Sequence, residues 1–204
     1  MQEVVKSVYF DQDTILDAIQ TLYCPDGFEC DITYGKGGFY KNRPRPSKCF
    51  DIQPMDVCVT KADSACLPLS KHGVSNLIFD PPFLTYIRDA RKGNGSMVMS
   101  NQFGGYWKYE ELETHYKDTL KESARVLCYR GIMVFKCQDI IHNHKMHCTH
   151  ANVIQWASEV ALRLVDLFVL VAKHRMPSPN RKGRQKHARI FHSYFLVLEN
   201  TNKQ

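Results

Sequence analysis

The chain has 204 residues, of which 44% are hydrophobic, so it can bury the core of one folded domain, and a disordered or fibrous protein is excluded. No apolar run reaches the length of a membrane span, and the N-terminus lacks the charged and apolar regions of a signal peptide. The eight cysteines include no Cys-x-x-Cys pair. We therefore expect an intracellular protein with reduced thiols and no membrane partner.

The formal net charge is +6, and the positive excess lies in two segments. One holds lysine and arginine residues between 36 and 48, and the other runs from 173 to 189 without an acidic residue. Such segments favour a polyanionic partner whose affinity falls as salt rises, and solvated loops are the alternative. The basic residues of the second segment are Lys173, Arg175, Arg181, Lys182, Arg184, Lys186 and Arg189.

In the first part of the chain, Asp11 or Asp13 can cap a helix that carries its apolar residues on one face and ends before Pro25. Short apolar segments then predict strands, with a glycine-rich turn at 34–40 between the first two. These predicted strands cover 28–33, 48–52, 57–60 and 75–80.

The second part of the chain opens with residues 84–108, which are rich in glycine, asparagine and serine and predict a long loop. The elements predicted after it are a helix at 109–127, a strand at 132–137, a helix at 149–164, and strands at 167–172 and 190–198. This order predicts an α/β protein with a mostly parallel twisted sheet, helices on both faces and an antiparallel C-terminal edge strand. We expect a single domain, 1–204, with loops at about 84–108 and 173–189.

The strand predicted at 75–80 leads into the sequence Asp-Pro-Pro-Phe at 80–83. The two prolines restrict the backbone, so the carbonyl oxygens beside Asp80 point in fixed directions. A carboxylate, a rigid carbonyl and an aromatic ring together suit a planar heterocycle that bears an amino group. Predicted strand ends are also where α/β sheets bind ligands, and three more acids lie there: Asp31, Asp51 and Asp63.

On these residues the chain resembles the class I S-adenosylmethionine-dependent methyltransferases that methylate exocyclic amino nitrogens in nucleic acid. It looks most like the small DNA adenine-N6 methylases of phages and mobile elements, and the similarity extends over nearly the whole chain. The matching segments are 30–40, 62–69, 80–83, 125–127, 131–139, 187–189 and 192–195. One departure is visible: basic, proline-containing sequence follows the glycines at 35–38, where this family has a long helix.

The resemblance implies a Rossmann-like fold, S-adenosyl-L-methionine as the cofactor and DNA as the substrate, in the cytoplasm of a bacterial or phage-infected cell. Adenine N6 is the favoured target, because the Asp form of the motif is commoner in adenine-specific enzymes. Adenine N6 in RNA, cytosine N4 in DNA and an inactive nucleic-acid-binding protein on the same fold remain alternatives. No large recognition domain fits in the chain, so a homodimer could complete recognition of a DNA site.

The resemblance also implies roles for the acids at the strand ends. Asp31 is expected near the cofactor's ammonium group, Asp51 at its ribose hydroxyls and Asp63 at its adenine amino group. The alternative for each is a turn or helix-capping aspartate. The same segments supply the other expected cofactor-binding residues, Tyr34, Gly35, Gly37 and Ser64.

At the target, the resemblance implies that Asp80 and the Pro81 carbonyl accept the two amino hydrogens. Pro82 keeps the turn rigid, and Phe83 stacks on the base. Methyl transfer is then a direct displacement that depends on positioning and electrostatics. A base within a duplex would first have to be flipped out, at a cost of a few kcal/mol.

Three other groups of residues are candidates for contacts near the target. Tyr106 and Trp107 could stack on a base or anchor the loop to the core. The segment 142–150 holds four histidines and a cysteine at spacings compatible with zinc. Amine methylation needs no metal, so we predict none and interpret this segment as a loop or a nucleic-acid contact. Gln138 and Asp139 could line the target pocket or cap the next helix.

Overall fold

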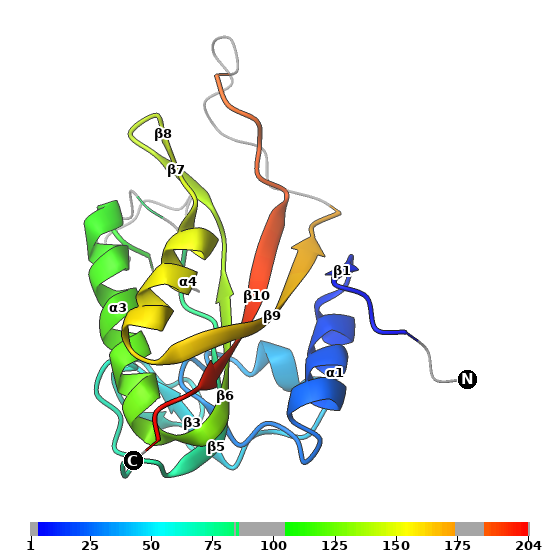
Figure 1. The fold of residues 1–204 in the computed structure, drawn as a ribbon, viewed down its shortest axis with the longest axis vertical. Coiled ribbons are helices and arrows are strands. Elements are labelled where there is room, and N and C mark those ends of the chain that lie inside the picture. Colours follow the sequence, from blue (N-terminus) through cyan, green and yellow to red (C-terminus); the bar gives the residue numbers. More distant parts are fainter. Residues whose placement is uncertain (1–3, 84, 86–104, 174–185, 204) are drawn as a thin grey trace.

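The computed structural model describes residues 4–83, residue 85, and residues 105–173 and 186–203. Its centre is an eight-stranded sheet (Figure 1). The strands are β1 (Val8–Tyr9), β2 (Cys30–Asp31), β3 (Lys48–Asp51), β4 (Thr60–Lys61), β5 (Val74–Phe79), β6 (Leu127–Cys137), β9 (Leu162–Val171) and β10 (His192–Asn200). Across the sheet they lie in the order β1-β9-β10-β6-β5-β2-β3-β4.

Helices cover both faces of this sheet (Figure 1). The helix α1 (Gln12–Tyr23) packs on one face, and α3 (Tyr109–Val126) and α4 (Thr149–Glu159) pack on the other. Asp11 caps α1 as expected, since its carboxylate accepts the Thr14 backbone N–H at 2.9 Å. In the described part of the chain, no helix is both long and apolar enough to cross a membrane.

Side chains along the central strands alternate between two hydrophobic cores. On β5, Ile78 faces α1, whereas Phe79 packs against Tyr116 of α3 and Phe135 of β6. All four side chains are fully buried. Burial of an aromatic or aliphatic side chain of this size stabilises the fold by about 1.5–3 kcal/mol. Strands buried on both faces are typical of parallel sheets.

The predicted fold class is confirmed: a mostly parallel sheet, helices on both faces and an antiparallel C-terminal strand. The position of that last strand is now defined more closely. β10 pairs antiparallel with both β6 and β9, and β1 adds in parallel to β9. The C-terminal strand therefore lies inside the sheet, because β9 and β1 extend the sheet beyond it.

Several element boundaries differ from the sequence expectation, and backbone conformation explains two of them. α4 ends at Glu159 rather than near 164, because Ala161 adopts a left-handed φ of 61° before β9 begins. β6 begins at Leu127 rather than at 132 and passes through Arg130, which has a φ of 63°. Gly131 is required there, since a Cβ atom would lie 2.9 Å from the Cys128 carbonyl oxygen.

A short hairpin that the sequence did not predict follows β6. Its strands are β7 (Ile140–His142) and β8 (Lys145–His147), and they pair antiparallel. Asn143 and His144 form the two-residue turn, with φ angles of 49° and 58°. Positive φ at both central residues is the signature of a type I′ hairpin turn, which asparagine favours. Much of the histidine-rich segment is therefore an ordered hairpin.

Candidate active site

The acids predicted at the strand ends meet at one edge of the sheet. Asp31 and Asp51 are the last residues of β2 and β3, Asp63 follows β4, and Asp80 follows β5. These four strands are adjacent and parallel, so their carboxyl ends point the same way. Ligands bind in α/β sheets at this edge.

Asp31 is buried, and both of its carboxylate oxygens are already engaged. Its Oδ2 accepts the Tyr40 hydroxyl at 2.6 Å, and its Oδ1 accepts the Thr33 backbone N–H at 2.8 Å. Burial raises the pKa of Asp31 to about 7, the hydrogen bonds from Tyr40 and Thr33 oppose the rise, and the nearby charges of Asp80 and Asp51 add to it. Asp31 therefore lies at the predicted edge, with its side chain held inside the turn.

Asp51 joins the ends of β2 and β3 through the backbone. Its Oδ2 accepts the Gly35 N–H at 2.8 Å, and its Oδ1 accepts the Gln53 N–H at 2.7 Å. Gly35 and Gly37 have φ angles of 55° and 68°, and a Cβ on Gly37 would lie 2.6 Å from the Tyr34 hydroxyl. Both glycines are thus needed for the turn, although this need by itself identifies no ligand.

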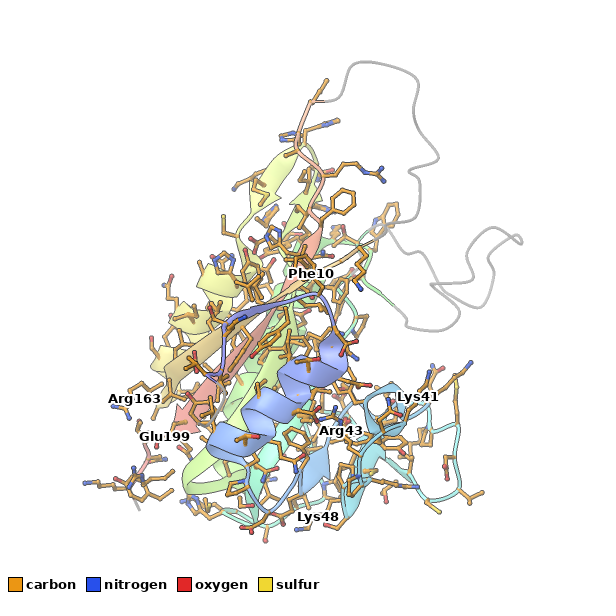
Figure 2. The ribbon with its side chains drawn as sticks, turned by 90° about the vertical axis from the view of Figure 1, so that its right-hand side faces the viewer. Phe10, Lys41, Arg43, Lys48, Arg163 and Glu199 are labelled. Carbon is orange, nitrogen blue, oxygen red and sulfur yellow. The ribbon has the colours of Figure 1, made fainter. Side chains whose placement is uncertain are left out.

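The connection from β2 to β3 holds a single turn of 3₁₀ helix, η1 (Gly38–Tyr40), instead of a long helix. The basic residues there are largely used within the fold. Arg43 contacts Asp13 and Asp17 on α1 at 3.4 and 3.0 Å, with only 4% of its side chain exposed. Figure 2 shows Arg43 against α1 and Lys41 extending outward. The segment 36–48 therefore ties this connection to α1, with Lys41 left on the surface.

Asp63 and Ser64, which follow β4, differ in exposure. Asp63 is more accessible and accepts the Ala65 N–H at 2.9 Å, an arrangement typical of an aspartate turn. Ser64 is buried, and its hydroxyl contacts His115 Nε2 at 2.7 Å and Thr119 at 3.0 Å. Of the two, only Asp63 presents its side chain toward solvent.

Asp80 is held by two neighbouring segments. Its backbone N–H donates to the Thr33 hydroxyl at 2.7 Å, which ties the end of β5 to the end of β2. Its Oδ2 accepts the Lys136 ammonium at 3.1 Å, with 26% of the Asp80 side chain and 12% of the Lys136 side chain exposed. Lys136 also donates to Gln12 Oε1 at 2.9 Å. The acid of the Asp-Pro-Pro-Phe sequence is therefore an oriented ion-pair partner at the sheet edge.

The turn that follows Asp80 is fixed from the other face of the sheet. The hydroxyl of the buried Tyr116 donates to the Pro82 carbonyl at 3.1 Å. Pro81 is buried, and Phe83 is half-buried. The rigidity that the two prolines impose is thus reinforced by a contact from α3.

Lys136 is the residue of this site that sequence reasoning missed. Its ammonium lies 5.0 Å from the centre of the Phe39 ring and 5.5 Å from that of Phe195, which is cation–π distance. A usable signal was present: a single lysine interrupts the buried run from Ile132 to Cys137. A charge at such a position requires a partner, and Asp80 is the acid that it pairs with.

A polar network lies where β6 ends and β10 begins. The carboxylate of the buried Asp139 contacts His150 Nδ1 at 2.7 Å and accepts the Tyr194 hydroxyl at 3.2 Å. It also accepts the His150 backbone N–H at 3.2 Å, so Asp139 caps α4. Gln138 donates to the His192 carbonyl at 2.8 Å. Among the described residues, no three His, Cys, Asp or Glu side chains gather as a metal site.

The predicted nucleic-acid-binding residues are only partly described. Tyr106 is half-buried, and its hydroxyl contacts His115 Nδ1 at 2.5 Å, so it anchors the chain before α3. Trp107 lines a pocket between α3 and the β7–β8 hairpin. Lys173, Lys186 and Arg189 are exposed and belong to the described parts of the connection from β9 to β10. The remaining predicted basic residues lie outside the described part of the chain: Arg175, Arg181, Lys182 and Arg184.

Sequence comparison finds no match, neither to a protein-family profile nor to a curated protein. Solved structures do resemble this chain. A candidate sarcosine dimethylglycine methyltransferase from Galdieria sulphuraria has a TM-score of 0.55 at 13% identity, over 93% of this chain and 85% of that one. The N-methyltransferase NodS from Bradyrhizobium japonicum has a TM-score of 0.52 at 12% identity, over 92% and 95%.

Two further structures were also matched. The cyclase SpnF has a TM-score of 0.55 at 12% identity, over 92% of this chain and 81% of that one. A candidate DNA modification methylase from Thermus thermophilus has a TM-score of 0.43 at 14% identity, over 67% of this chain. This chain spans only 48% of that protein, about half its length. The fold alone does not identify the reaction, which depends on the residues of the site.

The order of the strands agrees with these likenesses. The parallel strands β4-β3-β2-β5-β6 are followed by the antiparallel β10 and then by β9. Helices pack on both faces, and the acids collect at the carboxyl edge. The chain has a Rossmann-like fold, which it shares with the Galdieria sulphuraria and NodS methyltransferase structures.

Proposed function

We propose that this chain is an S-adenosylmethionine-dependent methyltransferase that acts on the exocyclic amino nitrogen of a base in DNA, with adenine N6 as the target. The observation that carries the proposal is the geometry at Asp80. Its carboxylate is oriented by Lys136 at 3.1 Å. The Pro82 carbonyl, which follows the proposed Pro81 acceptor, is held by the Tyr116 hydroxyl at 3.1 Å. A carboxylate and a rigid turn at this edge suit an amino-bearing ring.

The side chains at the ends of β3 and β4 fit the proposed cofactor. Each Asp51 oxygen accepts one backbone N–H and retains a second lone pair for a ribose hydroxyl. The accessible Asp63 can accept from an adenine amino group. Asp31 stays predicted beside the cofactor's ammonium group, with its carboxylate already engaged by Tyr40 and Thr33. Tyr34, Gly35 and Gly37 shape the turn after β2, and Ser64 contacts His115 of α3.

The residues around Asp80 are placed to make an aromatic amino group a better nucleophile. An amino group on an aromatic ring is a poor nucleophile, because its lone pair is delocalised into the ring. We assign Asp80 Oδ1 and the Pro81 carbonyl to accept the two amino hydrogens, since Lys136 binds Oδ2. When bound, the cofactor supplies a methyl group on a sulfonium, and its transfer leaves a neutral thioether and one proton to release. Phe83 stacks on the base and excludes water from one face.

Exposed positive charge supports a polyanionic substrate. Lys173 and Lys186 are exposed; Lys173 follows the end of β9, and Lys186 precedes the start of β10. Because β9 and β6 both pair antiparallel with β10, β9 ends at the same edge of the sheet as β6, beside Asp80. Lysine side chains that approach phosphates release counterions, so binding should weaken steeply as salt rises. The same charge serves RNA, and the same acceptor geometry serves cytosine N4. RNA as the substrate and cytosine N4 as the target are therefore both included in the test.

The test is transfer of a labelled methyl group from S-adenosyl-L-methionine to genomic DNA that lacks the modification. We expect incorporation into DNA, and a loss of about 10²–10³-fold in rate for Asp80→Ala, because a positioned acceptor of the transition state is removed. Cofactor affinity, measured by calorimetry, should stay within about twofold to threefold, which matches an effect of only a few tenths of a kcal/mol.

Four outcomes would change the assignment. Label in RNA alone would move the substrate to RNA, and label on cytosine would move the target base. An Asp80→Ala variant with full activity would remove Asp80 from the mechanism. Absence of both methyl transfer and cofactor affinity in the unaltered protein would leave a nucleic-acid-binding protein on this fold.

A further inference from the structure

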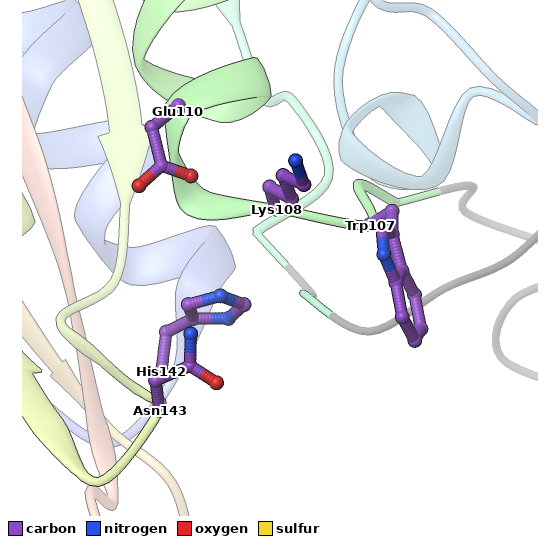
Figure 3. Close-up of a pocket in the computed structure, with 5 residues that line it drawn as sticks. All are labelled: Trp107, Lys108, Glu110, His142 and Asn143. Atoms are coloured by element: carbon purple, nitrogen blue, oxygen red, sulfur yellow. The ribbon is translucent and has the colours of Figure 1, made fainter.

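A pocket of about 480 Å³ lies between the start of α3 and the β7–β8 hairpin. It is lined by Trp107, Lys108, Glu110, His142 and Asn143. Figure 3 shows the Glu110 carboxylate directed toward the hairpin and the His142 ring directed toward the helix, with Trp107 along another side. Its volume lies within the range of small-ligand sites, about 300–1,000 Å³.

The helix wall of this pocket is held in place by Glu111. The carboxylate of Glu111 accepts the Trp107 backbone N–H at 2.9 Å and the Lys108 N–H at 3.5 Å. These bonds form part of the capping box that begins α3 at Tyr109. Trp107 is therefore attached to the first turn of a long helix, so its backbone position is defined.

The hairpin wall is attached to the same helix. The ring of His147 on β8 stacks on the ring of Tyr109, with centroids 3.8 Å apart. The Tyr109 hydroxyl in turn accepts the Asn152 side-chain N–H from α4 at 2.9 Å. Tyr109 is buried, so this joint lies within the core. Helix and hairpin thus form two fixed walls, and the pocket between them is preorganised.

The position of the pocket relates it to Asp80. The β7–β8 hairpin follows the carboxyl end of β6, and Asp80 follows the carboxyl end of β5. These two strands are parallel neighbours, so the hairpin and Asp80 extend from the same edge of the sheet. Tyr116 of α3 contacts the turn after Asp80 directly, at the Pro82 carbonyl. A polymer with one base at Asp80 would therefore pass close to this pocket.

The lining groups match a nucleobase. The indole of Trp107 offers a stacking surface, and the carboxylate of Glu110 can accept from an exocyclic amine. The Asn143 side-chain amide carries both donor and acceptor groups, the combination that reads a base edge. The exposed Lys108 and Lys145 lie at the two walls, where they can meet phosphates.

We propose that this pocket binds a base next to the target base and discriminates among bases at that position. This inference rests on the proposed function, because it assumes a nucleic-acid substrate. It would give the proposed enzyme a means to select a short sequence around the target base.

The probes are fluorescein-labelled single-stranded oligonucleotides with one central adenine, in which each neighbouring position is varied among four bases and an abasic site. Fluorescence anisotropy gives their affinities for the full chain. We expect one base at one position to bind about tenfold more tightly than the abasic site, as stacking and one base contact allow. That preference should fall to about twofold or less in Trp107→Leu, Glu110→Gln and Asn143→Gly.

The variants are chosen to preserve the fold. Glycine tolerates the φ of 49° at position 143, so Asn143→Gly removes the amide and keeps the hairpin turn. Glu113→Gln is the matched control, because Glu113 lies on the same helix one turn later and pairs with Lys117 away from the pocket. This control should keep the base preference, and circular dichroism should show the same helical content in all four variants.

Two results separate the failure of this inference from the failure of the proposed function. Tight binding of all oligonucleotides with equal base preference in the unaltered protein and the three variants would overturn the pocket and leave the proposed function standing. Absence of binding to any DNA or RNA oligonucleotide would overturn the proposed function itself. A preference that is lost equally in Glu113→Gln would also reject the pocket.

Discussion

The two halves of the sheet's carboxyl edge are built differently. In the half that we propose binds the cofactor, the cofactor half at the ends of β2 and β3, Asp31 and Asp51 accept mainly backbone N–H groups from the turns beside them. In the half that we propose binds the target base, the target half at the ends of β5 and β6, Asp80 is oriented by the Lys136 side chain, which also contacts Gln12 of α1. One half is organised by local backbone and the other by side chains from distant segments.

We therefore expect the acids of the cofactor half to shape its turns and the side chains of the target half to position the reacting groups. Removal of an acid in the cofactor half should change how the turn folds and how its stability depends on pH. Removal of a partner in the target half should leave the fold intact and reduce the rate. The following predictions test that contrast, in order of decreasing expected effect.

The largest expected effect concerns the stability of the cofactor half. The pKa of Asp31 is raised by burial to about 7 in the folded protein, against an ordinary value of 3.8. The folded state therefore retains a proton that the unfolded state loses, so stability is highest below about pH 4 and falls as pH rises toward 7. Between about pH 4.5 and 6.5, Asp31 should lower the free energy of unfolding by about 3 kcal/mol, at about 1.4 kcal/mol for each pH unit.

Urea unfolding at several pH values measures this effect as the difference between the unaltered protein and Asp31→Asn. The Tyr40 hydroxyl lowers the pKa of Asp31, so Tyr40→Phe should extend the loss of stability to higher pH. A difference between the unaltered protein and Asp31→Asn that stays constant across this pH range would contradict the buried, proton-retaining carboxyl.

In the target half, Lys136→Met should reduce methyl transfer by about tenfold to a hundredfold, because a misplaced reacting group costs that much. Lys136→Arg should restore part of the rate, since arginine can also bind the carboxylate. In an Asp80→Asn background, Lys136→Met should have little further effect, because the two residues act together. Losses that simply multiply would mean that Lys136 supports the fold and not Asp80. Lys117→Met, which removes an exposed ion pair on α3, is the control.

The smallest expected effect concerns the surface beyond both halves. Lys173→Ala combined with Lys186→Ala should lower the slope of log affinity against log salt by about 1 to 2, as expected for two phosphate contacts. Binding of DNA at several salt concentrations gives this slope. A slope identical to that of the unaltered protein would remove these lysines from the DNA-binding surface.

How much the sequence could predict differs between the same two halves. Asp80 and its prolines are adjacent in the chain, and the helices α1 and α3 have clear apolar periodicity, so local patterns located them. The Asp80–Lys136 pair joins residues 56 positions apart, and the Tyr109–His147 stack joins residues 38 positions apart. Pattern reasoning does not reach contacts of that kind, which depend on strand order and register.

In the cofactor half, the sequence predicted the absence of a long helix but not the contact that Asp31 makes. The glycines at 35 and 37 and the later prolines indicated that no long helix would follow, and η1 agrees. The engagement of Asp31 by Tyr40 depends on that single turn of 3₁₀ helix, which places the ring back over β2. A sequence pattern for so short an element is weak, because one turn gives no periodicity.

The central claim is that Asp80 directs a methyl group to an exocyclic amino nitrogen of DNA. Its most direct test is nucleoside analysis by mass spectrometry of DNA incubated with the protein and S-adenosyl-L-methionine. We expect N6-methyladenine with the unaltered protein and its near absence with Asp80→Ala. A methyl group found on a ring carbon, or N6-methyladenine formed equally by both proteins, would contradict it.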